Sequence, residues 1–167
     1  MRELILEVDE TRAGRTIRSL LTGELKLSAG LVSRLKFRPS GILLNGVRAR
    51  TSARVAAGDI LRVDVGDAGS GKRSFEPVDL PLVILFEDSD LLIIDKPAGL
   101  PVHHSGRFSE TPTVGDAIAF HWGAGAVFHP VSRLDRGTSG VMCIARSGYI
   151  HDRLRRSLHT GDYLRRY

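Results

Sequence analysis

Cysteine is almost absent from this sequence. The one cysteine in 167 residues, Cys143, cannot form a disulfide within the chain and lies in the apolar run 141–145. A single thiol in apolar surroundings fits a reducing compartment, so we expect a cytoplasmic protein. Runs of eighteen apolar residues are also absent, and we therefore expect no membrane-spanning helix.

Acidic residues are scarce between residues 12 and 54. This block holds ten Lys or Arg residues and one acid, Glu24. Residues 66–145 hold six basic and ten acidic residues, and residues 146–167 hold six Arg and two Asp. Charge runs are usually solvated surface, but this excess favours a polyanionic partner, of which nucleic acid is the commonest.

A stretch rich in Gly, Ser and charged residues, 66–79, divides the sequence and is interpreted as a linker. It separates a domain at 1–65 from a second domain at 80–167. In the first domain, Thr11 and Ser28 are each predicted to cap a short helix. The pair Asn45-Gly46 between extended segments predicts a β-hairpin.

The second domain begins with two apolar runs, 82–86 and 91–94, that are joined by a tight acidic turn. A third run, 141–145, is predicted to be a buried strand. Thr113 and Ser147 are predicted to cap helices, because apolar residues recur at helical spacing after each of them. The fold class we expect is α+β.

Three familiar motifs are rejected. Residues 66–72 match the first seven positions of a phosphate-binding loop, but Arg73 replaces the required Ser or Thr, and two prolines prevent the helix that should follow. The spacing of the histidines fits no usual zinc pattern, and a second cysteine is lacking, so we expect no metal. Residues 137–140 are one residue too short for the Gly-x-Ser-x-Gly turn of serine hydrolases.

The most informative segment is Arg133-Leu134-Asp135-Arg136-Gly137-Thr138-Ser139-Gly140, which precedes the apolar run 141–145. An aspartate between two arginines is kept ionised and available as a nucleophile or base. The alternative is a structural loop in which Asp135 pairs with an arginine and caps a turn. Residue chemistry alone favours that structural alternative.

This segment closely resembles the active-site motif of the RluA-type ribosomal RNA pseudouridine synthases. A second motif of that family resembles residues 91–100, a strand entering the loop Lys96-Pro97-Ala98-Gly99, with His103 close behind. A third resembles residues 164–167, where a basic residue stands two places before Tyr167. The three motifs occur in the family's order.

The first domain resembles the alpha-L RNA-binding domain, which often precedes these synthases. The resemblance rests on two short basic helices, the Asn45-Gly46 hairpin, and the segment Val55-Ala56-Ala57-Gly58-Asp59-Ile60. It implies that basic residues of this domain contact RNA phosphates. The residues we expect to do so are Arg15, Arg18, Arg34, Lys36, Arg38 and Arg48.

The family resemblance implies isomerisation of uridine to pseudouridine in ribosomal or transfer RNA, without a metal or cofactor. It assigns Asp135 as the catalytic carboxylate. Arg133 would enter the RNA where the uridine has flipped out, and Tyr167 would stack on the flipped uracil. Lys96 and Pro97 would shape the pocket wall, and the catalytic domain would combine helices with a mixed, mainly antiparallel sheet.

The family's catalytic domain continues beyond the position of Tyr167, so we expect the chain to carry only the front part of that domain. The later part supplies an arginine that pairs with the catalytic aspartate. The alternative hypothesis is a non-catalytic RNA-binding protein related to these enzymes. Ser132 stands where the family usually has histidine, and this difference bears on the choice of substrate. The sequence predicts no oligomeric state.

Overall fold

The computed structural model describes residues 2–67, 75–104, 110–123, 126–160 and 164. The chain forms two compact units, Met1–Gly66 and Asp67–Tyr167. Among the described residues, no helix has both the length and the apolar character needed to cross a membrane.

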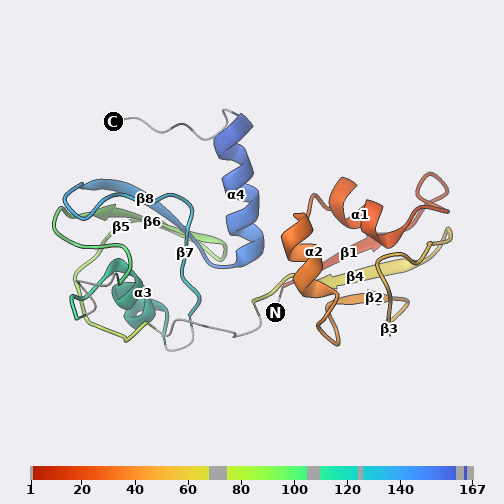
Figure 1. Ribbon diagram of the computed structural model, residues 1–167, viewed down its shortest axis with the longest axis horizontal. Coiled ribbons are helices and arrows are strands. Elements are labelled where there is room, and N and C mark those ends of the chain that lie inside the picture. Colours follow the sequence, from red (N-terminus) through yellow and green to blue (C-terminus); the bar gives the residue numbers. More distant parts are fainter. Residues whose placement is uncertain (1, 68–74, 105–109, 124–125, 161–163, 165–167) are drawn as a thin grey trace. The chain divides into compact units, whose positions relative to one another are not determined.

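The first unit places two helices on one face of a four-stranded antiparallel sheet (Figure 1). Strand β4 shows the alternation of a half-buried strand, since Leu61 and Val63 are fully buried while their neighbours face outward. The strand order is β1-β4-β2-β3. The elements are β1 (Glu3–Glu7), α1 (Ile17–Gly23), α2 (Ala29–Leu35), β2 (Ile42–Leu44), β3 (Val47–Arg48) and β4 (Ile60–Asp64).

One predicted cap in the first unit is wrong and one is confirmed. Ser28 caps α2 by accepting a hydrogen bond from the backbone N–H of Leu31 at 3.2 Å. Helix α1 is capped by Thr16, not by Thr11. Thr11 donates its hydroxyl to Asp9 at 2.6 Å instead, because the Asp9 carboxylate organises a turn before the helix.

The hairpin at Asn45-Gly46 is confirmed. Both residues have positive φ angles, 52° and 79°, which is the backbone that a two-residue hairpin turn requires. The Asn45 side chain also bonds to Asp59 and to the N–H of Ile60, each at 2.8 Å. The turn is therefore fastened to the start of β4.

The second unit is built on another four-stranded sheet, in the order β5-β6-β8-β7. Every strand pairing in the described residues is antiparallel. The elements are β5 (Val83–Glu87), β6 (Leu91–Lys96), α3 (Val114–Trp122), β7 (His129–Pro130), β8 (Gly140–Ala145) and α4 (Gly148–Thr160). The fold is α+β.

Helix α3 covers one face of this second sheet (Figure 1). Its residues Val114 and Ile118 share a core with Leu92, Ile94 and other side chains of β6 and β8. The predicted cap Thr113 is confirmed: it accepts from the N–H of Asp116, whose carboxylate accepts in return from the Thr113 N–H. This reciprocal bonding fixes where α3 begins.

Strand β5 differs from the other strands because all five of its residues are exposed. Val83, Leu85 and Phe86 keep 60%, 52% and 49% of their surface accessible. The strand pairs with β6 on one side only, with an irregular register between Ile84 and Phe86. An apolar edge strand of this kind is a surface suited to further packing.

Candidate active site

Two loops that are distant in the sequence meet at the end of the second sheet. The first, residues 97–100, follows β6, and the second, residues 133–139, precedes β8. The N–H of Gly99 donates to the carbonyl of Arg136 at 2.8 Å, and Nε of Arg136 donates back to the Gly99 carbonyl at 3.0 Å. Gly99 has a φ of +90°, a conformation that favours glycine. The two loops that carry the predicted motifs thus form one structure.

A buried lysine holds this structure together. Lys96 is the last residue of β6, and none of its surface is accessible. Its Nζ donates to the carbonyls of Pro97 at 2.8 Å, Leu100 at 2.9 Å and Arg136 at 3.3 Å. An ammonium group has three N–H donors, so each finds one acceptor. Burial lowers the pKa of Lys96, since it disfavours the charged form.

Helix α3 supports the first loop from the other side. The N–H of Val114, the first residue of α3, donates to the carbonyl of Pro101 at 2.9 Å. The next N–H, of Gly115, reaches the carbonyl of Val102 at 3.4 Å. The loop after Lys96 is therefore held at both ends, by the strand before it and by the helix.

Asp135 lies on the exposed part of the second loop. Its backbone carbonyl accepts from the N–H of Thr138 at 3.1 Å, which closes a turn. Among the described residues its carboxylate has no hydrogen bond or ion pair, so the predicted structural pairing with a flanking arginine is not found. Arg136 is turned toward Gly99 instead. The carboxylate is accessible to a ligand.

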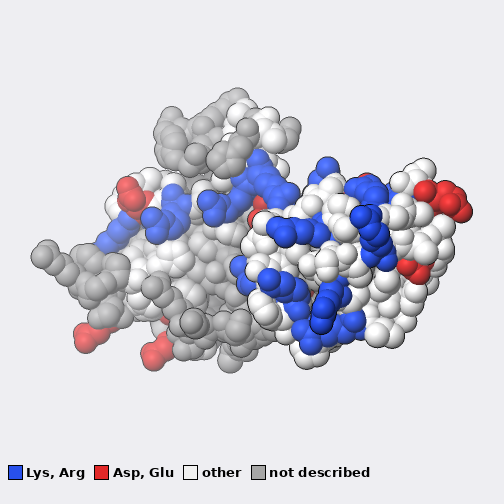
Figure 2. All heavy atoms as spheres, turned by 45° about the vertical axis from the view of Figure 1, so that its right-hand side comes forward, with Lys and Arg blue, Asp and Glu red and all other residues white. Residues whose placement is uncertain are grey.

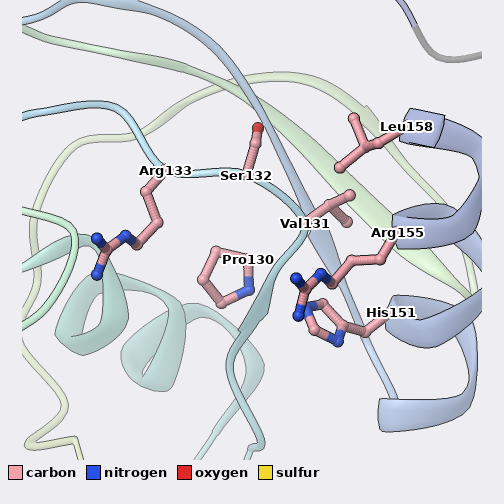
Figure 3. Close-up of a pocket in the computed structure, with 7 residues that line it drawn as sticks. All are labelled: Pro130, Val131, Ser132, Arg133, His151, Arg155 and Leu158. Atoms are coloured by element: carbon pink, nitrogen blue, oxygen red, sulfur yellow. The ribbon is translucent and has the colours of Figure 1, made fainter.

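Arg133 is exposed and lines a pocket that lies between its own segment and α4. Figure 3 shows its guanidinium on the opposite side of Pro130 from Arg155 and His151. Tyr167, which we predict to stack on the uracil, lies outside the described residues. The roles assigned to Asp135, Arg133 and Tyr167 stay predictions.

The predicted phosphate-binding residues of the first unit differ in how they are engaged. Arg15 forms an ion pair with Glu24 at 2.7 Å. Arg38 donates to the carbonyl of Gly66, and Arg48 donates to that of Lys36 at 2.9 Å. Figure 2 shows how densely Lys and Arg side chains cover the visible face of this unit.

The other three predicted residues keep their charges available. The guanidinium groups of Arg18 and Arg34 have no hydrogen bond or ion pair within the part of the chain that the structure describes. The ammonium of Lys36 lies 4.8 Å from the ring of exposed Phe37. Arg18, Arg34 and Lys36 are thus the residues best placed for an outside anion.

Sequence reasoning missed an anchor at the end of β5. Glu87 accepts from Nε1 of Trp122 at 2.8 Å and from Arg146 at 3.0 Å, and it also bonds His121 at 2.8 Å. These hydrogen bonds and charges lower the pKa of Glu87. The anchor joins the end of β5 to the end of α3 and to Arg146, the residue that follows β8. The Glu-Asp pair at 87–88 was a signal for it, but its partners come from distant segments.

The rejected motifs add nothing to the site. Most of the glycine-rich stretch 66–72 lies outside the described residues. Asp67, which is described, accepts from the N–H of Gly148 and bonds His129, each at 3.0 Å. Within the described ranges, no three His, Cys, Asp or Glu side chains gather as a metal ligand set.

Comparison with known proteins gives a consistent result. Residues 90–167 match the family described as RNA pseudouridylate synthase. An uncharacterized RNA pseudouridine synthase of Bacillus subtilis is 33% identical over 87% of this chain and 52% of that protein. One of Mycoplasma genitalium is 34% identical over 77% of this chain and 42% of that protein.

Other relatives carry more specific names. A ribosomal large subunit pseudouridine synthase D of Xanthomonas campestris is 36% identical over 75% of this chain and 38% of that protein. The solved structure of human RNA pseudouridylate synthase domain containing 4 has a TM-score of 0.36 and 30% identity, covering 48% of this chain and 30% of that one. The chain spans about half the length, or less, of these relatives.

The family match covers both loops of the site. Its range, 90–167, includes β6, the loop after Lys96, and the loop that bears Asp135. Residues 90–167, which carry both loops, therefore match the RNA pseudouridylate synthase family, as the motif resemblance in this segment predicted.

Proposed function

We propose that this protein converts specific uridines of ribosomal RNA to pseudouridine. The observation that carries the proposal is that hydrogen bonds join the two motif loops. Lys96 and Gly99 both donate to the backbone carbonyl of Arg136, the residue next to Asp135. Relatives named as ribosomal large subunit pseudouridine synthases support ribosomal RNA as the substrate class. A similar yeast protein named tRNA pseudouridine(31) synthase makes transfer RNA the second substrate to test.

The reaction is an isomerisation. The bond between N1 of uracil and C1′ of ribose breaks, the uracil turns, and C5 bonds to C1′. The hydrogen on C5 leaves as a proton, and N1 takes up a proton. Atoms and electrons balance without an oxidant, reductant or second substrate. The protein must therefore hold the base, exclude competing reactions and provide a group that handles the charge or the proton.

The proposed roles follow from accessibility. The carboxylate of Asp135 is exposed and unpaired among the described residues, so it can reach a base that has left the helix. Arg133, two residues away, is exposed beside it and would occupy the space that the uridine leaves. Tyr167 would stack on the flipped base, as base–aromatic contacts do in RNA-binding proteins.

RNA is also the proposed partner of the first unit. Phosphate contacts position a nucleic acid without reading its sequence. The exposed cations Arg18, Arg34 and Lys36 would make such contacts, with Arg38 and Arg48 beside them. Arg15 would contribute less, since Glu24 already neutralises it.

The test is tritium release from ribosomal RNA labelled at C5 of uridine. Pseudouridine formation replaces the C5–H bond by a C5–C1′ bond, so each turnover releases one tritium to water. We expect release by the full-length protein, in proportion to the pseudouridine found in the digested RNA. RNA binding without any release, from ribosomal or transfer RNA, would contradict the proposal and favour a non-catalytic RNA-binding protein.

A further inference from the structure

A pocket beside the Asp135 loop has no assigned role. Its volume is about 410 Å³, and it lies between the segment 130–133 and helix α4 (Figure 3). Pockets of this size hold small ligands, so it is larger than one phosphate group needs. The residues that line it are Pro130, Val131, Ser132, Arg133, His151, Arg155 and Leu158.

The described side chains that line this pocket carry charges of one sign. Of these seven described residues none is acidic, while two are arginines. The guanidinium groups of Arg133 and Arg155 have no hydrogen bond or ion pair with another described residue. The nearby acids are already engaged, because Asp152 pairs with Arg156 at 3.1 Å and Asp67 bonds His129 at 3.0 Å.

Helix α4 directs three side chains into the pocket. His151, Arg155 and Leu158 follow one another at spacings of four and three residues, which places them on one face of the helix. Figure 3 shows Arg155 and His151 side by side. Burial is the main cause that lowers the pKa of His151, and the neighbouring His129 and Arg155 also lower it. Its imidazole is therefore neutral at pH 7 and can donate or accept a hydrogen bond.

The opposite wall is suited to a sugar or a base. Pro130 and the buried Val131 present apolar surface, and Ser132 adds a hydroxyl. Ser132 stands three residues before Asp135, so the chain allows at most about 11 Å between their Cα atoms. A strand that brings a uridine to Asp135 therefore passes within reach of this pocket.

We infer that the pocket holds a nucleotide of the RNA strand next to the target uridine, with the phosphate on Arg155. A guanidinium binds phosphate through two parallel N–H donors. His151 and Ser132 would bond the ribose, and the apolar wall would contact the sugar or base. This inference rests on the proposed function for the identity of the strand, and it adds Arg155 and His151 as substrate-positioning residues.

The test compares two arginines of the same helix. Arg155 lines the pocket, whereas Arg156 is paired with Asp152 and does not. Arg155→Gln and Arg156→Gln each remove one charge, and both sites are exposed, so folding is checked simply by thermal unfolding. The probe is a single-stranded oligouridylate, and its affinity for the full-length protein is measured by fluorescence anisotropy across a series of potassium chloride concentrations.

We expect Arg155→Gln to weaken binding about five- to tenfold and to reduce the slope of log affinity against log salt by about 0.7, the loss of one phosphate contact. Arg156→Gln should change neither quantity. Equal effects of the two variants, or no effect of either, would overturn the inference. Uridine 5′-monophosphate or inorganic phosphate binding as tightly as the strand would also overturn it.

The outcome is independent of catalysis. Binding is measured without isomerisation. If the protein binds oligouridylate through Arg155 but releases no tritium, the pocket inference stands and the proposed function is wrong. If the protein releases tritium but Arg155→Gln leaves the salt slope unchanged, the proposed function is supported and the pocket inference is wrong.

Discussion

The two units of this protein have opposite designs. The first has a closed core, with Leu20, Leu35 and Leu61 fully buried, and it places its charges outside. The second has a lysine inside and an apolar strand, β5, outside. The first unit exposes cations, which we propose to contact RNA. The second is built around the joined motif loops and leaves the apolar strand β5 exposed at the edge of its sheet.

The largest expected effect on RNA binding concerns the first unit. Deleting residues 1–66 should weaken the binding of ribosomal RNA and lower its salt slope by roughly three to four units, if about five phosphates are contacted. The reason is the excess of basic residues between Arg12 and Arg54. Filter binding at several salt concentrations measures it, and an unchanged slope would show that the basic face is only solvated surface.

Point variants test which cations of the first unit contribute to RNA binding. Arg18→Gln and Arg34→Gln remove charges without a described partner, so each should lower the salt slope by about 0.7–0.9. Arg15→Gln is the matched control, because Glu24 already pairs with Arg15. A loss at Arg15 as large as at Arg18 and Arg34 would mean that ion pairing does not decide which cations meet RNA.

The next effect concerns stability and comes from the buried Lys96. Lys96→Met removes the donor shared by three carbonyls, and we expect a loss of about 2–4 kcal/mol in the free energy of unfolding. Urea unfolding of the second unit measures it. The control Lys36→Met lies on the surface and should stay within about 0.5 kcal/mol of the parent. Equal stability of the two variants would contradict the role given to Lys96.

A variant in strand β5 tests how this edge differs from the edge strand β1 of the first unit. We expect the 167-residue chain to self-associate through β5, and Leu85→Lys to reduce that association, because a charge on an edge strand opposes pairing. Light scattering against concentration measures it. The control Ile5→Lys changes an equally exposed residue of β1, where apolar exposure is not continuous, and should have no effect. Association that survives Leu85→Lys would place the contact elsewhere.

The smallest expected effect is a pH dependence. All six histidines follow residue 102, so between pH 5 and 7 the second unit is the more sensitive one. The pKa of His151 lies below its usual value of 6.5 in the folded protein. As pH falls below 6.5, the unfolded chain binds the proton first, so stability is lost.

The variant His151→Gln removes this contribution. We expect it to reduce the acid-induced fall in Tm between pH 7.5 and 5.5 by about 1–3 °C, as followed by thermal unfolding. Its control is His121→Gln at the Glu87 anchor, which should leave the His151 contribution in place. A His151→Gln variant with the parent's full acid sensitivity would contradict the assignment.

Local chemistry made much of this fold predictable. Ser28, Thr113 and the Asn45-Gly46 turn act within three or four residues, so the sequence carries their whole signal. The cap at Thr16 was missed because the competing Thr11 is occupied by Asp9, a contact that sequence spacing alone does not decide.

The site was predictable only in part. The motif resemblance located both loops, but not how they are joined, because the acceptors of Lys96 come from residues up to 40 positions away. The pocket beside α4 was also missed. Its residues are unremarkable in sequence and become a site only when the 130–133 segment lies beside the helix.

The central claim is that Asp135 carries the chemistry of this unit, and a pair of aspartates tests it most directly. Asp135→Asn in the full-length protein should lower tritium release from uridine-labelled ribosomal RNA by on the order of a thousandfold or more, while RNA binding is retained. Asp95→Asn, at an exposed carboxylate on β6, should keep normal release. Near-normal release by Asp135→Asn, or an equal loss from both variants, would contradict the account.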